Sequence, residues 1–278
     1  MNILSSIMQK IFFRHVKAKP NRRWKERAKS LGAFHPFNLS RSGKKLSCYQ
    51  IIPKNPVSED GQGIDIGNRL VIFSHPISRK GKYFFSDSER AQTYLQRGFS
   101  VIAFDYNGFG ESDSIDLFYW RDVAAVIDYA KKNFPGYEIV LHGTSFGAFH
   151  IIRALEYLPY GAEVVLENVN KSLLNYWRRW PTTGLLVRVL ELLRIKAIQE
   201  MDVQSVVRKF QRQDLHIQFI ACENDHLTTL AEMRELFEQL ATENKSFAVF
   251  TGAGHLAAPG KDPALYQTVL FNRGCRPC

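Results

Sequence analysis

The sequence predicts one α/β domain, with a mostly parallel central sheet, helices on both faces and a small helical cap. A hairpin pattern comes first, and short apolar runs then alternate with amphipathic helical patterns. The length of 278 residues suits a single large core. A helical stretch at about 171–212 interrupts the alternation, and we interpret it as a cap inserted over the carboxyl ends of the strands.

The predicted strands are short runs of apolar and β-branched residues. The hairpin pairs 34–41 with 46–52 across a turn at 42–44, and a polar, glycine-containing loop follows at 54–68. Buried parallel strands are expected at 70–74, 99–104, 138–142, 162–166, 217–222 and 246–250.

The predicted helices lie between these strands. The sequence Ser86-Asp87-Ser88-Glu89 has the pattern of a capping box that opens a helix, which Gly98 then ends. A second capping box runs from Thr229 to Glu232 and opens a helix to about residue 241. The remaining helices are expected at 116–132, at 146–158 and from Pro263 onward.

Positive charge is concentrated at the start of the chain. The formal net charge is +10, and residues 1–31 hold nine lysines and arginines against one acidic residue. The domain that follows, 32–278, is therefore nearly neutral, and we expect no nucleic-acid partner. Apolar residues between 3 and 12 recur at helical spacing. This basic amphipathic segment either lies on an anionic membrane surface or, as we favour, packs on the domain or forms a basic tail.

The four cysteines, at 48, 222, 275 and 278, are too few and too scattered for a disulfide scaffold. We therefore expect a cytoplasmic protein, with peripheral contact to a membrane left open. Cys275 and Cys278 form a lone C-x-x-C, and no partner residues that would complete a metal or redox site are evident. The last four residues also match a prenylation motif poorly, so we expect a disordered C-terminal tail. No transmembrane helix, no metal and no cofactor are expected, and the oligomeric state is left open.

The sequence Gly143-Thr144-Ser145-Phe146-Gly147 has the pattern G-x-S-x-G between a predicted strand and a predicted helix. In that context, the turn exposes a serine nucleophile, and the glycines let strand and helix approach closely. The alternative is a buried serine that caps the helix. We favour Ser145 as the nucleophile, because the helix N-terminus adds a dipole that stabilises an oxyanion.

A serine nucleophile needs a base, and His255 is our choice among eight histidines. It follows the last strand in a glycine-containing loop, whereas His226 adjoins the proposed acid and is a poor geometric partner for it. The acid should lie between nucleophile and base in the chain, as Asp225 does after the strand at 217–222. Glu223 and Glu167 are the alternative acids.

Two backbone N–H groups should hold the oxyanion, and we expect them at Ile77 and Phe146. Pro76 has no N–H but restricts the loop before Ile77. Substrate contacts are expected from His75, Tyr106, Trp177 and Trp180.

Together these residues resemble the α/β-hydrolase superfamily, in particular its capped, single-domain serine esterase-like members. The resemblance covers about residues 34–272 and lies in His75-Pro76, the Asp-Tyr-Asn-Gly-Phe-Gly-Glu-Ser loop at 105–112, the 143–147 turn, Asp225 and His255. The family normally has His-Gly where this chain has His75-Pro76. The resemblance implies that Ile77 supplies the second oxyanion amide and that the 105–112 loop walls the pocket without reacting.

The expected activity is hydrolysis of a small-molecule ester or thioester through an acyl-enzyme on Ser145. A peptidase or amidase of the same fold is the first alternative, and a non-catalytic binding protein is the second. Arginines at 178, 179, 188 and 194 in the cap favour either an anionic or amphiphilic substrate or, as we prefer, a solvated surface.

Overall fold

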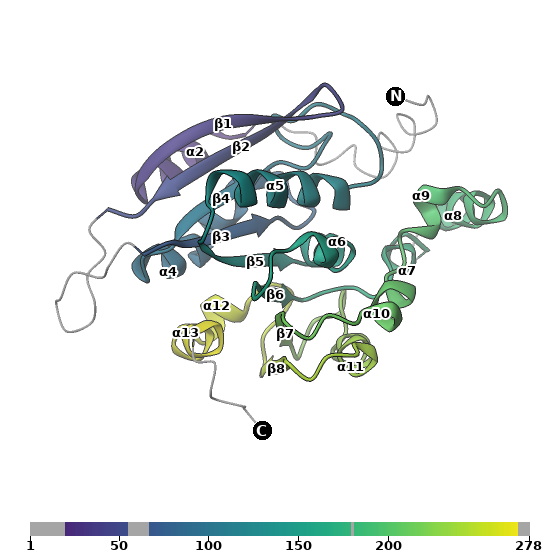
Figure 1. Ribbon diagram of the computed structural model, residues 1–278. Coiled ribbons are helices and arrows are strands. Elements are labelled where there is room, and N and C mark those ends of the chain that lie inside the picture. The colour runs from purple at the N-terminus through teal and green to yellow at the C-terminus, as the bar shows by residue number, and fades with distance from the viewer. Residues whose placement is uncertain (1–19, 55–66, 179–180, 272–278) are drawn as a thin grey trace.

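In the part of the chain that the structure describes, eight strands form one sheet in the order β1-β2-β4-β3-β5-β6-β7-β8. Figure 1 shows this sheet in the computed structural model. The structure describes residues 20–54, 67–178 and 181–271. The expected helix between 3 and 12, most of the 54–68 loop and the C-x-x-C tail lie outside these residues. The strands are β1 (Ala33–Arg41), β2 (Lys44–Ile52), β3 (Arg69–Ser74), β4 (Ser100–Phe104), β5 (Glu138–Thr144), β6 (Glu163–Glu167), β7 (His216–Cys222) and β8 (Lys245–Phe250).

The sheet is parallel from β4 to β8, and the hairpin of β1 and β2 adds two antiparallel strands at one edge. A two-residue turn joins the hairpin, because Ser42 and Gly43 both have positive φ and Arg41 pairs with Lys44. This arrangement confirms the predicted fold class and places every strand that the sequence predicted.

Helices cover both faces of the sheet, and alternate strand residues face each layer. On β3, Leu70 and Ile72 join the core under α5 (Trp120–Asn133), α6 (Phe146–Ala154) and α11 (Leu230–Gln239). Val71 and Phe73 join a second core under α2 (Arg22–Ser30), α4 (Arg90–Gln96) and α13 (Pro263–Phe271). Short helices lie in the connections between these elements: η2 (Gly81–Tyr83), α3 (Phe84–Asp87), η3 (Leu155–Tyr157) and α12 (Ala258–Lys261).

Four helices interrupt the alternation between β6 and β7: α7 (Leu173–Arg178), α8 (Pro181–Leu192), α9 (Lys196–Gln199) and α10 (Gln204–Lys209). Figure 1 shows them on the right, the side toward which β3 points. The insertion expected at 171–212 therefore lies beyond the carboxyl ends of the parallel strands. Within the described residues, no helix has the length and apolarity needed to cross a membrane.

The structure corrects the capping box predicted at 86–89. Ser86 lies inside α3, where its hydroxyl donates to the carbonyl of Tyr83 (3.1 Å), and Glu89 has φ 64° with no side-chain cap. The chain is already helical from Gly81, because Phe85 packs its ring against Phe73 of the sheet (4.1 Å between centroids). The N-cap of the second capping box is confirmed, since Thr229 Oγ1 accepts from the N–H of Glu232 (3.3 Å).

The helix predicted at 116–132 starts later, at Trp120. Asp116 forms an ion pair with Arg41, and its other oxygen accepts from the N–H of Phe118 (2.9 Å). These contacts hold the segment before Trp120 in a turn. The helix predicted at 146–158 ends as an α-helix at Ala154 and continues as η3.

Candidate active site

Ser145 lies in a tight turn between β5 and α6. Its backbone has φ 51° and ψ −113°, a conformation that is strained for a residue with a side chain. A Cβ at position 147 would lie 1.9 Å from the Ser74 carbonyl oxygen, and one at position 143 would lie 2.6 Å from the Ala148 nitrogen. Both glycines are thus needed for the close approach. The Ser145 side chain does not cap α6, which argues against a purely structural capping role.

His255 and Asp225 form a direct pair on the loops after β8 and β7. His255 Nδ1 lies 2.6 Å from Asp225 Oδ2. The aspartate side chain is fully buried, whereas the imidazole is 23% exposed. His226, the alternative base, is exposed. The structure therefore joins the histidine and the acid that the sequence predicted as partners.

Three neighbours hold the Asp225 carboxylate in place. Asn168 Nδ2 donates to Oδ2 (2.7 Å), the hydroxyl of Thr228 donates to the same oxygen, and Oδ1 accepts from the backbone N–H of Leu227 (2.8 Å). Burial alone would raise the pKa of Asp225, but the hydrogen bond and charge of His255 and the Thr228 donors outweigh it and lower that pKa. The carboxylate is thus kept ionised beside the imidazole.

A chain of contacts connects Ser145 to this pair. The Ser145 N–H donates to the carbonyl of Glu167 (2.8 Å), and the next residue, Asn168, binds Asp225. Among the described residues, no hydrogen bond joins Ser145 Oγ to His255. Contacts between a nucleophile and its base are often long or poorly aligned before a substrate binds.

The loop after β3 lies directly against the first turn of α6. Ser74 pairs with Gly143 across the sheet, and its hydroxyl donates to the carbonyl of Gly147 (3.2 Å). The backbones of Ile77 and Phe146, the expected oxyanion donors, therefore belong to segments that are packed together beside Ser145.

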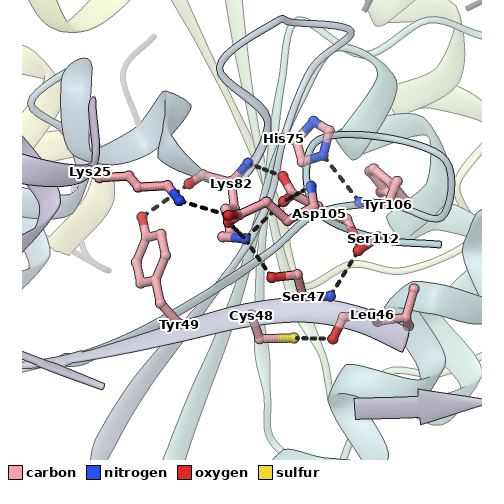
Figure 2. Close-up of polar contacts among 11 residues, drawn as sticks. Lys25, Leu46, Ser47, Cys48, Tyr49, His75, Lys82, Asp105, Tyr106 and Ser112 are labelled. Atoms are coloured by element: carbon pink, nitrogen blue, oxygen red, sulfur yellow. Dashed lines mark hydrogen bonds and ion pairs between the residues drawn. The ribbon is translucent and has the colours of Figure 1, made fainter. Parts of the chain in front are cut away.

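Figure 2 shows a buried polar cluster that supports this loop. Lys82 Nζ lies 2.9 Å from Asp105 Oδ2, 2.9 Å from Glu111 Oε2 and 2.7 Å from Ser47 Oγ. Burial opposes the charge on Lys82, but the two carboxylates raise its pKa. Lys25 of α2 donates to the other Glu111 oxygen (2.7 Å), so the cluster also joins α2 to the 105–112 loop after β4.

Glu167, an alternative acid in the sequence, has different partners. Its carboxylate forms a two-contact pair with Arg90 and also accepts from Tyr266 (3.2 Å), while His142 lies 3.4 Å away. Arg90 also donates to the carbonyl of Leu256 (2.9 Å), the residue after His255. Glu167 therefore supports the histidine loop and does not contact the imidazole of His255. Glu223, the other alternative, accepts from the N–H of Gly252 (2.7 Å) on the surface.

The buried pair of Glu167 and Arg90 predicts that the fold loses stability in acid. Burial would raise the pKa of Glu167, but Arg90 and His142 together lower it from 4.5 to about 2. A carboxyl whose pKa is depressed by folding stabilises the fold above its unfolded pKa, and this contribution is lost as the pH falls from about 4.5 toward 2. We expect the Tm, followed by circular dichroism, to fall across that window.

The control for this prediction is Glu167→Gln, which starts from a lower Tm at neutral pH. We expect its Tm to fall less steeply with acid than that of the wild type. Equal slopes for both proteins would contradict the assignment of this acid sensitivity to Glu167.

The predicted substrate-contacting residues are not gathered at an open surface. His75 and Tyr106 are fully buried, with the Tyr106 N–H donating to His75 Nε2 (3.3 Å), and Trp177 is 5% exposed in the cap. In this structure these side chains pack inside the fold, His75 against the rings of Tyr106 and Phe109, and they do not present a surface to a substrate. Trp180 lies outside the described residues.

Sequence reasoning missed Asn168, Thr228 and Arg90. Asn168 directly follows β6 at its carboxyl end and has φ 49°, and Thr228 is three residues after Asp225. Their chain positions, directly after a strand and three residues after Asp225, are the local signals that point to them. Arg90 offered none, because it is separated from Glu167 by 77 residues. Among the described residues, no group of three His, Cys, Asp or Glu side chains could hold a metal ion.

The comparisons with known proteins find a partial family match and a partial relative by sequence. Residues 80–172 match the model of the serine aminopeptidase family S33. This matched range includes Ser145 but ends before Asp225 and His255. A 31.7 kDa Escherichia coli protein from the traX-finO intergenic region, described as uncharacterized, is 37% identical over 71 residues. That match spans 23% of this chain and 25% of the relative's length.

Solved structures match over nearly the whole chain. An esterase from Pyrococcus furiosus has a TM-score of 0.65 at 18% identity, covering 92% of this chain and 97% of its own. An α/β hydrolase from Vibrio vulnificus has a TM-score of 0.71 at 15% identity, with coverages of 97% and 94%. Est1E from Butyrivibrio proteoclasticus, with ferulic acid bound, has a TM-score of 0.59 at 17% identity, with coverages of 84% and 99%. At these identities the likeness shows a shared fold.

Proposed function

From its α/β-hydrolase fold and from the arrangement of Ser145, His255 and Asp225, we propose that this chain is a serine hydrolase that cleaves a carboxylic ester or thioester. The contact between His255 Nδ1 and Asp225 Oδ2 (2.6 Å) carries this proposal. It fixes the tautomer that leaves Nε2 free of a proton and able to accept one from serine. The match to a serine peptidase family and the esterase among the similar structures support hydrolysis.

In the first step, Ser145 Oγ attacks the carbonyl carbon while His255 Nε2 takes the hydroxyl proton. The carbonyl electrons move to oxygen, and the N–H groups of Ile77 and Phe146 stabilise that oxyanion. Asp225 stabilises the positive imidazole without taking its proton. The oxyanion then collapses, and His255 returns the proton to the departing alcohol or thiol.

In the second step, water attacks the acyl-enzyme. His255 removes the proton of water, and the second oxyanion is held by the same two amides. Collapse of that oxyanion releases the carboxylic acid and returns the proton to Ser145. An ester or thioester is favoured, because alcohol and thiol leaving groups need less assistance from the acid than an amine does.

A panel of p-nitrophenyl esters and acyl thioesters tests this function, together with labelling by a fluorophosphonate probe. We expect turnover of at least one acyl series and labelling at Ser145, identified by peptide mass spectrometry. Labelling at another residue, or neither turnover nor labelling, would argue against the proposal.

A peptidase is the second candidate, and the match of residues 80–172 to an aminopeptidase family favours it. The same triad would serve, with His255 protonating an amine leaving group. Turnover of aminoacyl anilides in the absence of ester or thioester turnover would decide for the peptidase.

A further inference from the structure

The outer face of cap helix α8, together with the residue directly after the helix, carries exposed apolar side chains. Leu185 is 66% exposed, Val189 43%, Leu192 82% and Leu193 65%. Leu185, Val189 and Leu192 stand at positions i, i+4 and i+7, which share one side of a helix. Leu193 lies in the turn directly after α8, where its N–H donates to the Val189 carbonyl (3.0 Å). Only three other large apolar side chains among the described residues are comparably exposed. Such a concentration on a surface indicates a binding partner.

The opposite face of α8 is already used by the fold. Val187 and Leu190 are 0% and 3% exposed and join the core under the cap. Gly184 lies against α7, where an added Cβ would be 3.1 Å from the Arg178 carbonyl oxygen. The apolar outer face is therefore not needed to hold the cap on the domain.

Positive charge borders this apolar face. Arg188, Arg194 and Lys196 are exposed on α8 and the segment after it. Glu191 is the single acidic residue of 181–199, and it pairs with Arg178 (2.5 Å). A helix with an apolar face bordered by lysine and arginine has the character of those that lie in the interface of an anionic membrane.

We propose that the outer face of α8 binds the surface of an anionic lipid bilayer. The leucines enter the boundary between headgroups and acyl chains, and the three cations contact the lipid phosphates. Leu227, 39% exposed on the Asp225 loop, also lies at the carboxyl ends of the strands. Docking on this side would turn the cap and the rim that carries Ser145 toward the bilayer.

A second copy of the chain fits this face less well. A stable dimer buries roughly 800 Å² on each partner, which is more than one face of a twelve-residue helix supplies. Pairing two copies through α8 would also bring Arg188 and Arg194 of each copy toward those of the other. A lipid surface is not limited in area and has the opposite charge.

Co-sedimentation of the full chain with vesicles tests the proposal. We expect more binding to phosphatidylcholine mixed with phosphatidylglycerol than to phosphatidylcholine alone. The variant Leu192→Glu/Leu193→Glu should reduce the bound fraction by about tenfold or more, since it places two anions at the centre of the contact. Tyr160→Glu is the matched control, because Tyr160 is 90% exposed and lies at the other end of the sheet, before β6.

The outcomes separate the alternatives. Equal binding by the wild type and the double variant would overturn the proposal and point to residues 1–31. If the wild type were a dimer that does not bind vesicles and the double variant were a monomer, the proposal would be overturned. In that case α8 would bind a second copy of the chain. The inference does not depend on catalysis, so Ser145→Ala should bind vesicles as the wild type does even if the proposed function fails.

Discussion

Ser145→Ala is expected to lower kcat for ester hydrolysis on the order of 10⁴-fold or more. The variant keeps the turn and the two backbone amides but has no hydroxyl for the proposed base, His255, to activate. The residual rate should reflect binding and oxyanion stabilisation alone. The KM should change little, because the lost interaction forms mainly in the transition state. Steady-state kinetics with the best ester of the panel measure both parameters.

Thr144→Val is the matched control for this prediction. Thr144 is the neighbouring residue, its side chain is buried, and its hydroxyl has no hydrogen-bond partner. Replacing that hydroxyl by a methyl group keeps the shape and should leave kcat within a few-fold of the wild type. If Ser145→Ala retained its rate, another residue would have to be the nucleophile.

The strands along the chain, and the candidate residues at the carboxyl ends of three of them, could be predicted from the sequence because each has a local signal. The strands around Ser145 are short apolar runs, and Gly143 and Gly147 stand where a close approach requires glycine. Asp225 and His255 each follow a strand at its carboxyl end, and parallel strands bring such ends to one edge. Local sequence patterns and the topology of a parallel sheet are therefore enough to predict the strands and these candidate residues.

What the sequence did not predict depends on contacts between distant segments. The box at 86–89 matched a helix start, but the packing of Phe85 on Phe73 moved that start upstream. Glu167 had the right chain position for an acid, yet its carboxylate pairs with Arg90 and not with His255. No spacing rule relates two residues that meet only through tertiary packing.

The second large effect is expected from Arg90→Met, which should lower the free energy of unfolding by about 3–5 kcal/mol. The Arg90 and Glu167 side chains are 2% and 0% exposed, so the variant leaves a buried carboxylate without its main counterion. Urea unfolding followed by circular dichroism measures the loss. Lys171→Met is the matched control: it breaks a pair with Glu235 that is 22% and 41% exposed, and it should cost less than about 1 kcal/mol.

The same variant should also damage the site in molecules that remain folded. Leu256 has φ 60°, an unfavourable conformation for leucine, and Arg90 holds its carbonyl directly after His255. Without that hydrogen bond the loop can relax, so kcat measured well below the Tm should fall by more than the unfolded fraction explains. Arg90→Lys, which keeps the charge but not the planar two-contact geometry, should lie between the wild type and Arg90→Met. If Arg90→Met were destabilised but fully active when folded, the pair would support the core and not the histidine loop.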